Sequence, residues 1–197
     1  MNHYGLDPAW YFSAPGLACD ATLKITKIEL ELLSDPDMLL MIESGIRGGI
    51  ATISHRHAKA NNEYMGTEFD PAEETKFISY LDANNLYGWA MSKQLPTSGF
   101  KCKSDDELDD WKHLSCFLEV DLEYPEDLHD LHHDYPRARE RIRTRNVEKL
   151  ILNLNNKTNY IVHYENLKLN EGLGLKIKRF IEVLNSKKVL GLKDTLI

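Results

Sequence analysis

The sequence predicts an α+β fold in which a mixed or antiparallel sheet is flanked by helices. Three observations support this class. Residues 116–124, CFLEVDLEY, alternate apolar and mostly acidic side chains, as a half-buried strand does. Residues 16–26 and 35–45 space their apolar side chains like short helices. The chain has 197 residues, 42% of them hydrophobic, which is enough to bury a core as one domain or two small ones.

Local signals define the two N-terminal helices. Pro15 precedes the first of them, and Asp35 followed by Pro36 opens the second. An aspartate before a proline is a good helix start, because its carboxylate accepts hydrogen bonds from free backbone N–H groups. Gly45 is the expected C-cap of the second helix.

Strands and polar segments are predicted beyond these helices. Residues 50–54, IATIS, and 76–82, KFISYLD, contain β-branched and aromatic side chains and are predicted as strands. The polar residues 58–74 are predicted as a loop with helical pieces, and residues 83–93 as a turn and a helix. The remaining predicted elements are a helix over residues 160–172 and a strand over residues 174–184.

Composition indicates an intracellular chain without a membrane anchor. The densest short apolar run, residues 38–42, is far below the roughly 18 residues of a membrane span. The start MNHYGLDPAW lacks the basic and apolar regions of a signal peptide. Cys19, Cys102 and Cys116 are widely spaced and odd in number, which fits a reducing compartment. The sequence does not distinguish between the nucleus, the mitochondrion and a viral factory as the compartment.

Charge is divided unevenly along the chain. The formal net charge is −7, which alone disfavours a nucleic-acid partner. Residues 104–134 hold twelve Asp and Glu against one Lys, whereas residues 135–188 hold thirteen Lys and Arg against five Glu. The run RARERIRTR, residues 137–145, could face a phosphate backbone. The alternative is a solvated loop balanced by the acidic stretch before it.

Asp82 stands at the end of the predicted strand 76–82, within YLDANNLYGWAM. A carboxylate at the carboxyl end of a strand can project into a cleft and hold a hard divalent cation such as Mg²⁺, which prefers oxygen ligands. The alternative is that Asp82 caps the helix that follows.

The segment YLDANNLYG resembles the first polymerase motif, D-x-x-S-L-Y-P, of family B DNA polymerases, in the protein-primed branch of viruses, linear plasmids, organelles and transposons. GIRGG, residues 45–49, resembles the Y-x-G-G element that precedes this motif in the family. The segments AKANNEYM, FLEVDLEYPEDLHDLHHDYP and KTNYIVHYENLKL are also similar to transposon-like and virus-like members. The resemblance covers nearly the whole chain.

This resemblance implies a partial polymerase palm at residues 76–197, preceded by a linker region at residues 1–75 that contains the glycine pair. The implied activity is template-directed nucleotidyl transfer with two Mg²⁺ ions. The implied partners are a DNA template-primer, a dNTP and a terminal-protein primer. The resemblance implies that Asp82 is catalytic and binds metal together with the Ala83 carbonyl. It implies that Leu86 and Tyr87 bind the nucleotide, and that the Tyr87 ring excludes a ribose 2′-hydroxyl. The implied DNA contacts are Arg47, Gly48 and Gly49.

The chain departs from the family pattern in several places. Asn85, Gly88 and Ile46 replace the usual serine, proline and tyrosine. The second carboxylate motif, Y-x-D-T-D-S, and the fingers motif, K-x-x-x-N-S-x-Y-G, do not occur. We therefore expect a DNA polymerase fragment that is inactive alone. The alternative is a non-catalytic nucleic-acid-binding or structural remnant of a viral or mobile-element polymerase.

Other polar clusters carry weaker hypotheses. His129 and His133 would share a helix face, as zinc ligands often do, but no nearby Cys or Glu completes a set, and a polar surface turn is the favoured interpretation. His55 and His57 are expected to meet solvent or DNA. The acidic face of residues 119–123 could suggest cation or glycosidase chemistry, but alternation alone also produces a solvated strand face.

Overall fold

A computed structural model describes residues 4–91, 93, 95–103, 111–145 and 147–189. Its centre is a four-stranded antiparallel sheet with the order β1-β6-β2-β5, and β3 and β4 form a separate two-stranded sheet. The strands are β1 (Leu95–Lys103), β2 (Ser115–Glu123), β3 (Glu140–Thr144), β4 (Val147–Ile151), β5 (Lys157–His163) and β6 (Lys176–Val189). The predicted α+β class is confirmed.

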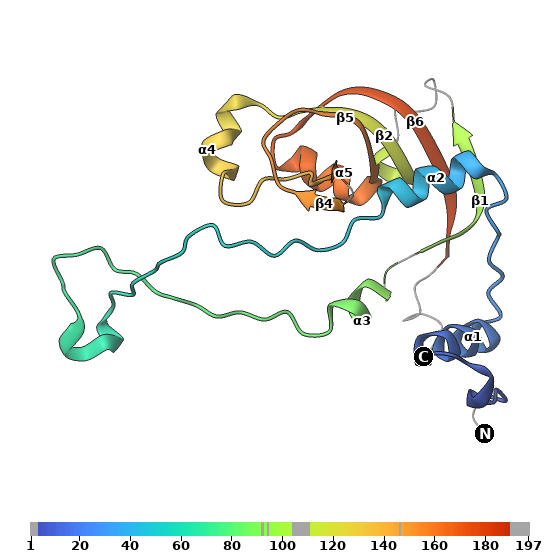
Figure 1. The fold of residues 1–197 in the computed structure, drawn as a ribbon, viewed down its shortest axis with the longest axis horizontal. Helices are drawn as coiled ribbons and strands as arrows, with labels where there is room; N and C mark the ends of the chain where they lie inside the picture. Colours follow the sequence, from blue (N-terminus) through green and yellow to red (C-terminus); the bar gives the residue numbers. More distant parts are fainter. Residues whose placement is uncertain (1–3, 92, 94, 104–110, 146, 190–197) are drawn as a thin grey trace.

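The helices α2 and α5 pack against the sheet, and Figure 1 shows the strands curling around α5. The α-helices are α1 (Ala14–Thr26), α2 (Pro36–Gly45), α3 (Leu86–Met91), α4 (His129–His132) and α5 (Tyr164–Gly172). The 3-10 helices are η1 (Pro8–Trp10), η2 (Glu63–Glu68), η4 (Trp111–His113) and η5 (Glu126–Leu128). Within the described residues, no helix is both long enough and apolar enough to cross a bilayer.

Both predicted N-terminal helices are present, and α1 begins two residues earlier than predicted, with Ser13 as its N-cap. The Ser13 hydroxyl accepts a hydrogen bond from the Gly16 N–H at 3.3 Å, and the Asp35 carboxylate accepts from the Asp37 N–H at 2.9 Å. Each cap satisfies backbone donors that have no partner inside the helix. The predicted C-cap of α2 was one residue early, because the helix includes Gly45 and Ile46 is the capping residue.

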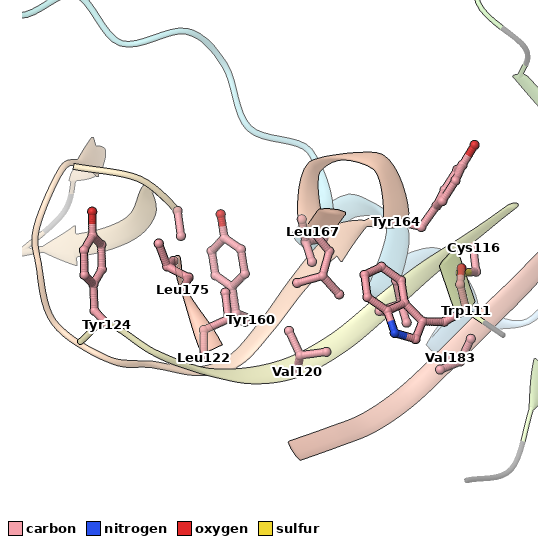
Figure 2. Close-up of a cluster of buried hydrophobic side chains, with 13 residues drawn as sticks. Trp111, Cys116, Val120, Leu122, Tyr124, Tyr160, Tyr164, Leu167, Leu175 and Val183 are labelled. Carbon is pink, nitrogen blue, oxygen red and sulfur yellow. The ribbon is translucent and has the colours of Figure 1, made fainter. Parts of the chain in front are cut away.

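The core lies between α5 and one face of β2. Leu118 and Val120 are fully buried, with Leu167 of α5 among their neighbours in the apolar cluster drawn in Figure 2. The intervening residues of β2 are only partly buried, so the predicted alternation is confirmed. On the opposite face α2 packs so closely that a Cβ on Gly45 would lie 3.3 Å from Ile161 and 3.6 Å from Phe117.

The strands predicted over residues 50–54 and 76–82 were wrong. Apart from the isolated bridge between Asn61 and Lys76, both segments are extended chain without strand pairing. They lie on the two limbs of a long arm, residues 46–85, which runs from the end of α2 to the start of α3 and has η2 at its far end (Figure 1). Aromatic and β-branched content favours an extended backbone, but a strand also needs a neighbour for its hydrogen bonds.

The helix predicted over residues 160–172 begins later, because its first residues belong to β5. Tyr160 and Val162 are buried on the core face, and Val162 pairs with Leu118 of β2. In residues 160–163 every second side chain is therefore buried, as in a strand, and the spacing is not that of a helix. The strand predicted over residues 174–184 is confirmed as part of β6, whereas β1 and the β3–β4 hairpin were not predicted.

Truncating Leu167 to alanine should lower the free energy of unfolding by about 2–5 kcal/mol, because it removes a fully buried side chain and leaves a cavity. Leu169→Ala on the same helix is the matched control, since Leu169 is 57% exposed and should change stability by about 0.5 kcal/mol at most. Urea denaturation measures both. Equal losses in the two variants would contradict the assigned core.

Candidate nucleic-acid interface

A pocket of about 170 Å³ lies where the end of α2, β5 and residues 135–139 meet. Its lining includes three arginines, Arg47, Arg137 and Arg139, together with Tyr135 and Tyr160. None of the Asp and Glu side chains that the structure describes lines it. The pocket is therefore rich in cationic donors and lacks the carboxylates that would balance them.

Arg47, which the sequence predicted as a DNA contact, enters this pocket from the end of α2. Its guanidinium lies 4.2 Å from the centre of the Tyr160 ring, within cation–π range. Its Nη1 donates to the Ile161 carbonyl at 2.5 Å and to the Gly45 carbonyl at 3.3 Å. Because β5 is an edge strand, Arg47 satisfies an acceptor that no further strand covers.

Two tyrosines fix the backbone that carries the other two arginines. The Tyr124 hydroxyl accepts from the Arg137 N–H at 3.1 Å, and the Tyr160 hydroxyl donates to the Arg139 carbonyl at 3.3 Å. Figure 2 shows the two rings with their hydroxyls directed to the same side. Between them, buried Ala138 has φ 51°, a conformation that costs an L-residue energy and persists where its surroundings hold it.

His132 completes this support from α4. The Tyr124 hydroxyl, which accepts from the Arg137 N–H, also forms a hydrogen bond with His132 Nδ1 at 2.8 Å. Burial, and then the charge of Arg137, lowers the pKa of His132. The neutral imidazole is therefore favoured here.

The charge in the pocket is incompletely satisfied. Burial lowers the pKa of Arg47; Tyr160 opposes this, and the charges of Arg139 and Arg141 add to it. The buried Nε atoms of Arg47, Arg137 and Arg139 have no hydrogen-bond partner within the described part of the chain. Buried donors without partners are costly, so an anion in the pocket would stabilise them.

Glu140, which directly follows Arg139, opposes the lowered pKa of Arg47, but its carboxylate is already engaged elsewhere. The Glu140 carboxylate accepts from the buried Lys157 ammonium at 2.9 Å and from the Asn153 amide at 2.6 Å. Burial lowers the pKa of Lys157, and the bond to Glu140 opposes that shift. Glu140 is thereby paired with a cation outside the pocket's arginines.

Basic side chains continue from the pocket onto the β3–β4 hairpin. Arg139 and Arg141 donate to the carbonyls of Arg47 and Ile46 at 3.3 and 2.6 Å, which joins the hairpin to the end of α2. The exposed cations of the hairpin and its turn are Arg141, Arg143, Arg145 and Lys149. Within the basic run 137–145, Arg137 and Arg139 line the pocket, whereas Arg141 and Arg143 belong to the strand β3. The alternative of a solvated loop was therefore wrong for Arg137 and Arg139.

The residues of the polymerase-like motif lie elsewhere. Asp82 and Ala83 are exposed on the limb that leads to α3, not at a strand end as predicted, and Leu86 is exposed where that helix begins. The side chain of Tyr87 lies outside the described part of the structure. Gly48 and Gly49 are exposed at the start of the other limb. Of the DNA contacts predicted from the sequence, only Arg47 lines the arginine pocket.

Asn85, rather than Asp82, caps α3. Its side-chain oxygen accepts from the Gly88 N–H at 3.1 Å. A Cβ on residue 88 would collide with the Asn85 side chain, and a proline there would lack the donated hydrogen. The two departures from the family motif are therefore structurally coupled.

The histidine pair proposed for zinc does not assemble. His129 instead packs edge-on against Tyr124, with ring centres 5.7 Å apart. Among the described residues, the potential ligands that gather are His55, His133 and Asp134. His55 and His133 were each singled out from the sequence, but their pairing was not predicted, because they are far apart along the chain.

The acidic face of β2 is occupied by neighbouring strands. Asp121 pairs with Arg179 at 3.1 Å, Glu123 pairs with Lys178 at 2.5 Å, and Glu119 accepts from the Asn159 amide at 2.6 Å. The hydrogen bond from Lys178 lowers the pKa of Glu123. These carboxylates act in cross-strand pairing.

Comparison with known proteins gives no relative for this chain: no family model matches it, and neither does any curated protein or solved structure. The site therefore has to be interpreted from its own geometry.

Replacing Arg47 with alanine should lower the free energy of unfolding by about 1–3 kcal/mol, because it removes the contact with Tyr160 and the bond to the Ile161 carbonyl. Arg143→Ala, at an exposed position of β3, is the control and should have little effect. Thermal or urea unfolding measures both. An unchanged Arg47→Ala protein would show that Arg47 does not hold the end of α2 against β5.

Proposed function

We propose that this chain binds the phosphate backbone of nucleic acid through the arginine pocket, as the DNA-binding part of a family B DNA polymerase. One observation carries the proposal. Three arginines line a pocket that no carboxylate lines, and their buried Nε atoms have no partner in the described part of the chain. Guanidinium groups match phosphate oxygens in charge and in hydrogen-bond geometry.

A polymer fits this surface better than a small free anion does. The lining residues 135–139 lead directly along the chain into the β3–β4 hairpin, where Arg143, Arg145 and Lys149 are exposed. A row of cations leading away from a pocket can follow successive phosphates along a strand. The neighbouring Tyr135 offers an exposed aromatic ring beside Arg137, with which a base could stack.

The polymerase part of the proposal rests on the resemblance of the motifs. In it, Arg47 contacts template-primer DNA, Asp82 and the Ala83 carbonyl offer oxygens to Mg²⁺, and Leu86 and Tyr87 adjoin a dNTP. Bound Mg²⁺ would supply charge neutralisation for nucleotidyl transfer. The residues present do not complete such a site, since no other potential ligands gather with Asp82 among the described residues. We therefore assign no catalytic step and expect no primer extension by this chain.

Replacing Arg137 and Arg139 together with alanine should weaken DNA binding and make its salt dependence shallower. Each lost phosphate contact should reduce the slope of log affinity against log salt by about 1. Fluorescence anisotropy with a labelled primer-template duplex, titrated between about 50 and 200 mM salt, measures both effects.

The control for this experiment is Arg179→Ala. Arg179 is also cationic and exposed, but it pairs with Asp121 on the strand β6, away from the pocket lining. It should leave the affinity and the slope close to those of the unchanged chain. Unfolding curves verify that each variant is folded. Absence of DNA binding, or equal losses in both variants, would contradict the proposal.

The polymerase part is tested separately with Asp82→Asn. If Asp82 shares Mg²⁺ with a nucleotide triphosphate, this change should weaken Mg²⁺-dependent dNTP binding by about tenfold, or about 1.4 kcal/mol. DNA binding through the arginine pocket should be unchanged. Calorimetric titration with and without Mg²⁺ measures the nucleotide affinity. If Mg²⁺–dNTP does not bind, or binds both proteins equally, the metal role of Asp82 is wrong while the DNA-binding proposal stands.

A further inference from the structure

His55, His133 and Asp134 form a cluster of metal-ligating side chains outside the arginine pocket. His55 lies on the limb of the arm that leaves α2, and the other two directly follow α4. His55 Nδ1 is 3.6 Å from Asp134 Oδ1, and His133 Nε2 is 3.0 Å from the same oxygen. One ligand atom from each side chain lies within 4.8 Å of the other two.

This spacing suits a single zinc ion. With bond lengths of about 2.0–2.2 Å and tetrahedral angles, ligand atoms around zinc lie about 3.3 Å apart. The two nitrogen-to-oxygen distances fall on either side of that value. All three side chains are exposed, so small rotations can close the remaining gap between the imidazoles.

The orientation of His133 supports metal binding. Its Nδ1 lies 2.8 Å from the Asp130 carbonyl oxygen, which can only accept, so Nδ1 carries the proton. In the neutral ring, Nε2 then presents its lone pair towards the Asp134 carboxylate. Two lone pairs 3.0 Å apart repel, and a cation between them removes the repulsion. A backbone carbonyl that fixes the tautomer in this way is the usual outer partner of a histidine ligand.

We infer that His55, His133 and Asp134 bind one Zn²⁺ ion, with water in the fourth position. Two imidazoles and one carboxylate are a common zinc donor set that leaves a position open. The ion would join the arm to the turn after α4, two segments that are distant in the sequence. With exposed ligands and one open position, we expect a Kd on the order of 10 µM.

Zinc titration against a competing chromophoric chelator tests this inference. The protein should carry Cys19→Ser and Cys102→Ser, because these two exposed thiols would compete for the metal. One equivalent of Zn²⁺ should bind, and His55→Ala or His133→Ala should each weaken binding by about 100-fold. The matched control is His57→Ala, which removes a neighbouring exposed histidine and should have no effect.

A second readout reports whether the metal fixes the arm. Arg56 is exposed next to His55. In the protein that carries Cys19→Ser and Cys102→Ser, Zn²⁺ should therefore slow tryptic cleavage after Arg56. The same protein with His133→Ala added should show no such slowing. Cleavage after the exposed Lys27 in the same digest is the internal control. Failure to bind one equivalent of Zn²⁺, or affinity unchanged by both histidine substitutions, would overturn the inference. So would protection of Arg56 that persists in His133→Ala.

Discussion

Three arginine side chains, Arg47, Arg137 and Arg139, share one pocket beside Tyr160, and no carboxylate from the described ranges of the chain lines that pocket. Burying cations without counter-charge is unfavourable, and here like charges add to the cost that burial imposes on Arg47. The Tyr160 ring and the carbonyls of β5 and α2 offset part of this cost. An anion that enters from solvent would offset more, and this is why we propose that the pocket is a binding site rather than a structural ion-pair network.

The sheet and its tyrosines make this arrangement possible. Tyr124 directly follows β2, Tyr160 belongs to the neighbouring strand β5, and their hydroxyls bind the two ends of the segment 137–139. The left-handed conformation of Ala138 lies between those two anchors. The same region organises the arm, because its first limb starts at Arg47 and passes His55, which meets the turn after α4. Anion binding and zinc binding would thus fix both ends of one segment.

Local signals predicted the elements whose hydrogen bonds or burial are decided within a few residues. Pro15 and helical spacing indicated α1, the Asp35 cap indicated α2, and alternation indicated β2. The segment 76–82 has comparable strand character but pairs with no strand, because pairing depends on chain that is distant in sequence. At the site, the glycine-rich element indicated Arg47. The contact of the 137–139 segment with β5, and of His55 with His133, depends on tertiary packing that no local pattern encodes.

The most direct test of the arginine pocket uses inorganic phosphate as the anion. Thermal unfolding is compared in millimolar phosphate and in chloride of equal ionic strength, for the unchanged chain and for the variant that lacks Arg137 and Arg139. A ligand that binds only the folded state raises Tm by mass action. We expect phosphate to raise Tm of the unchanged chain above its value in chloride, and to lose this effect in the variant. The same rise in both proteins, or no rise in either, would contradict an anion site at these arginines.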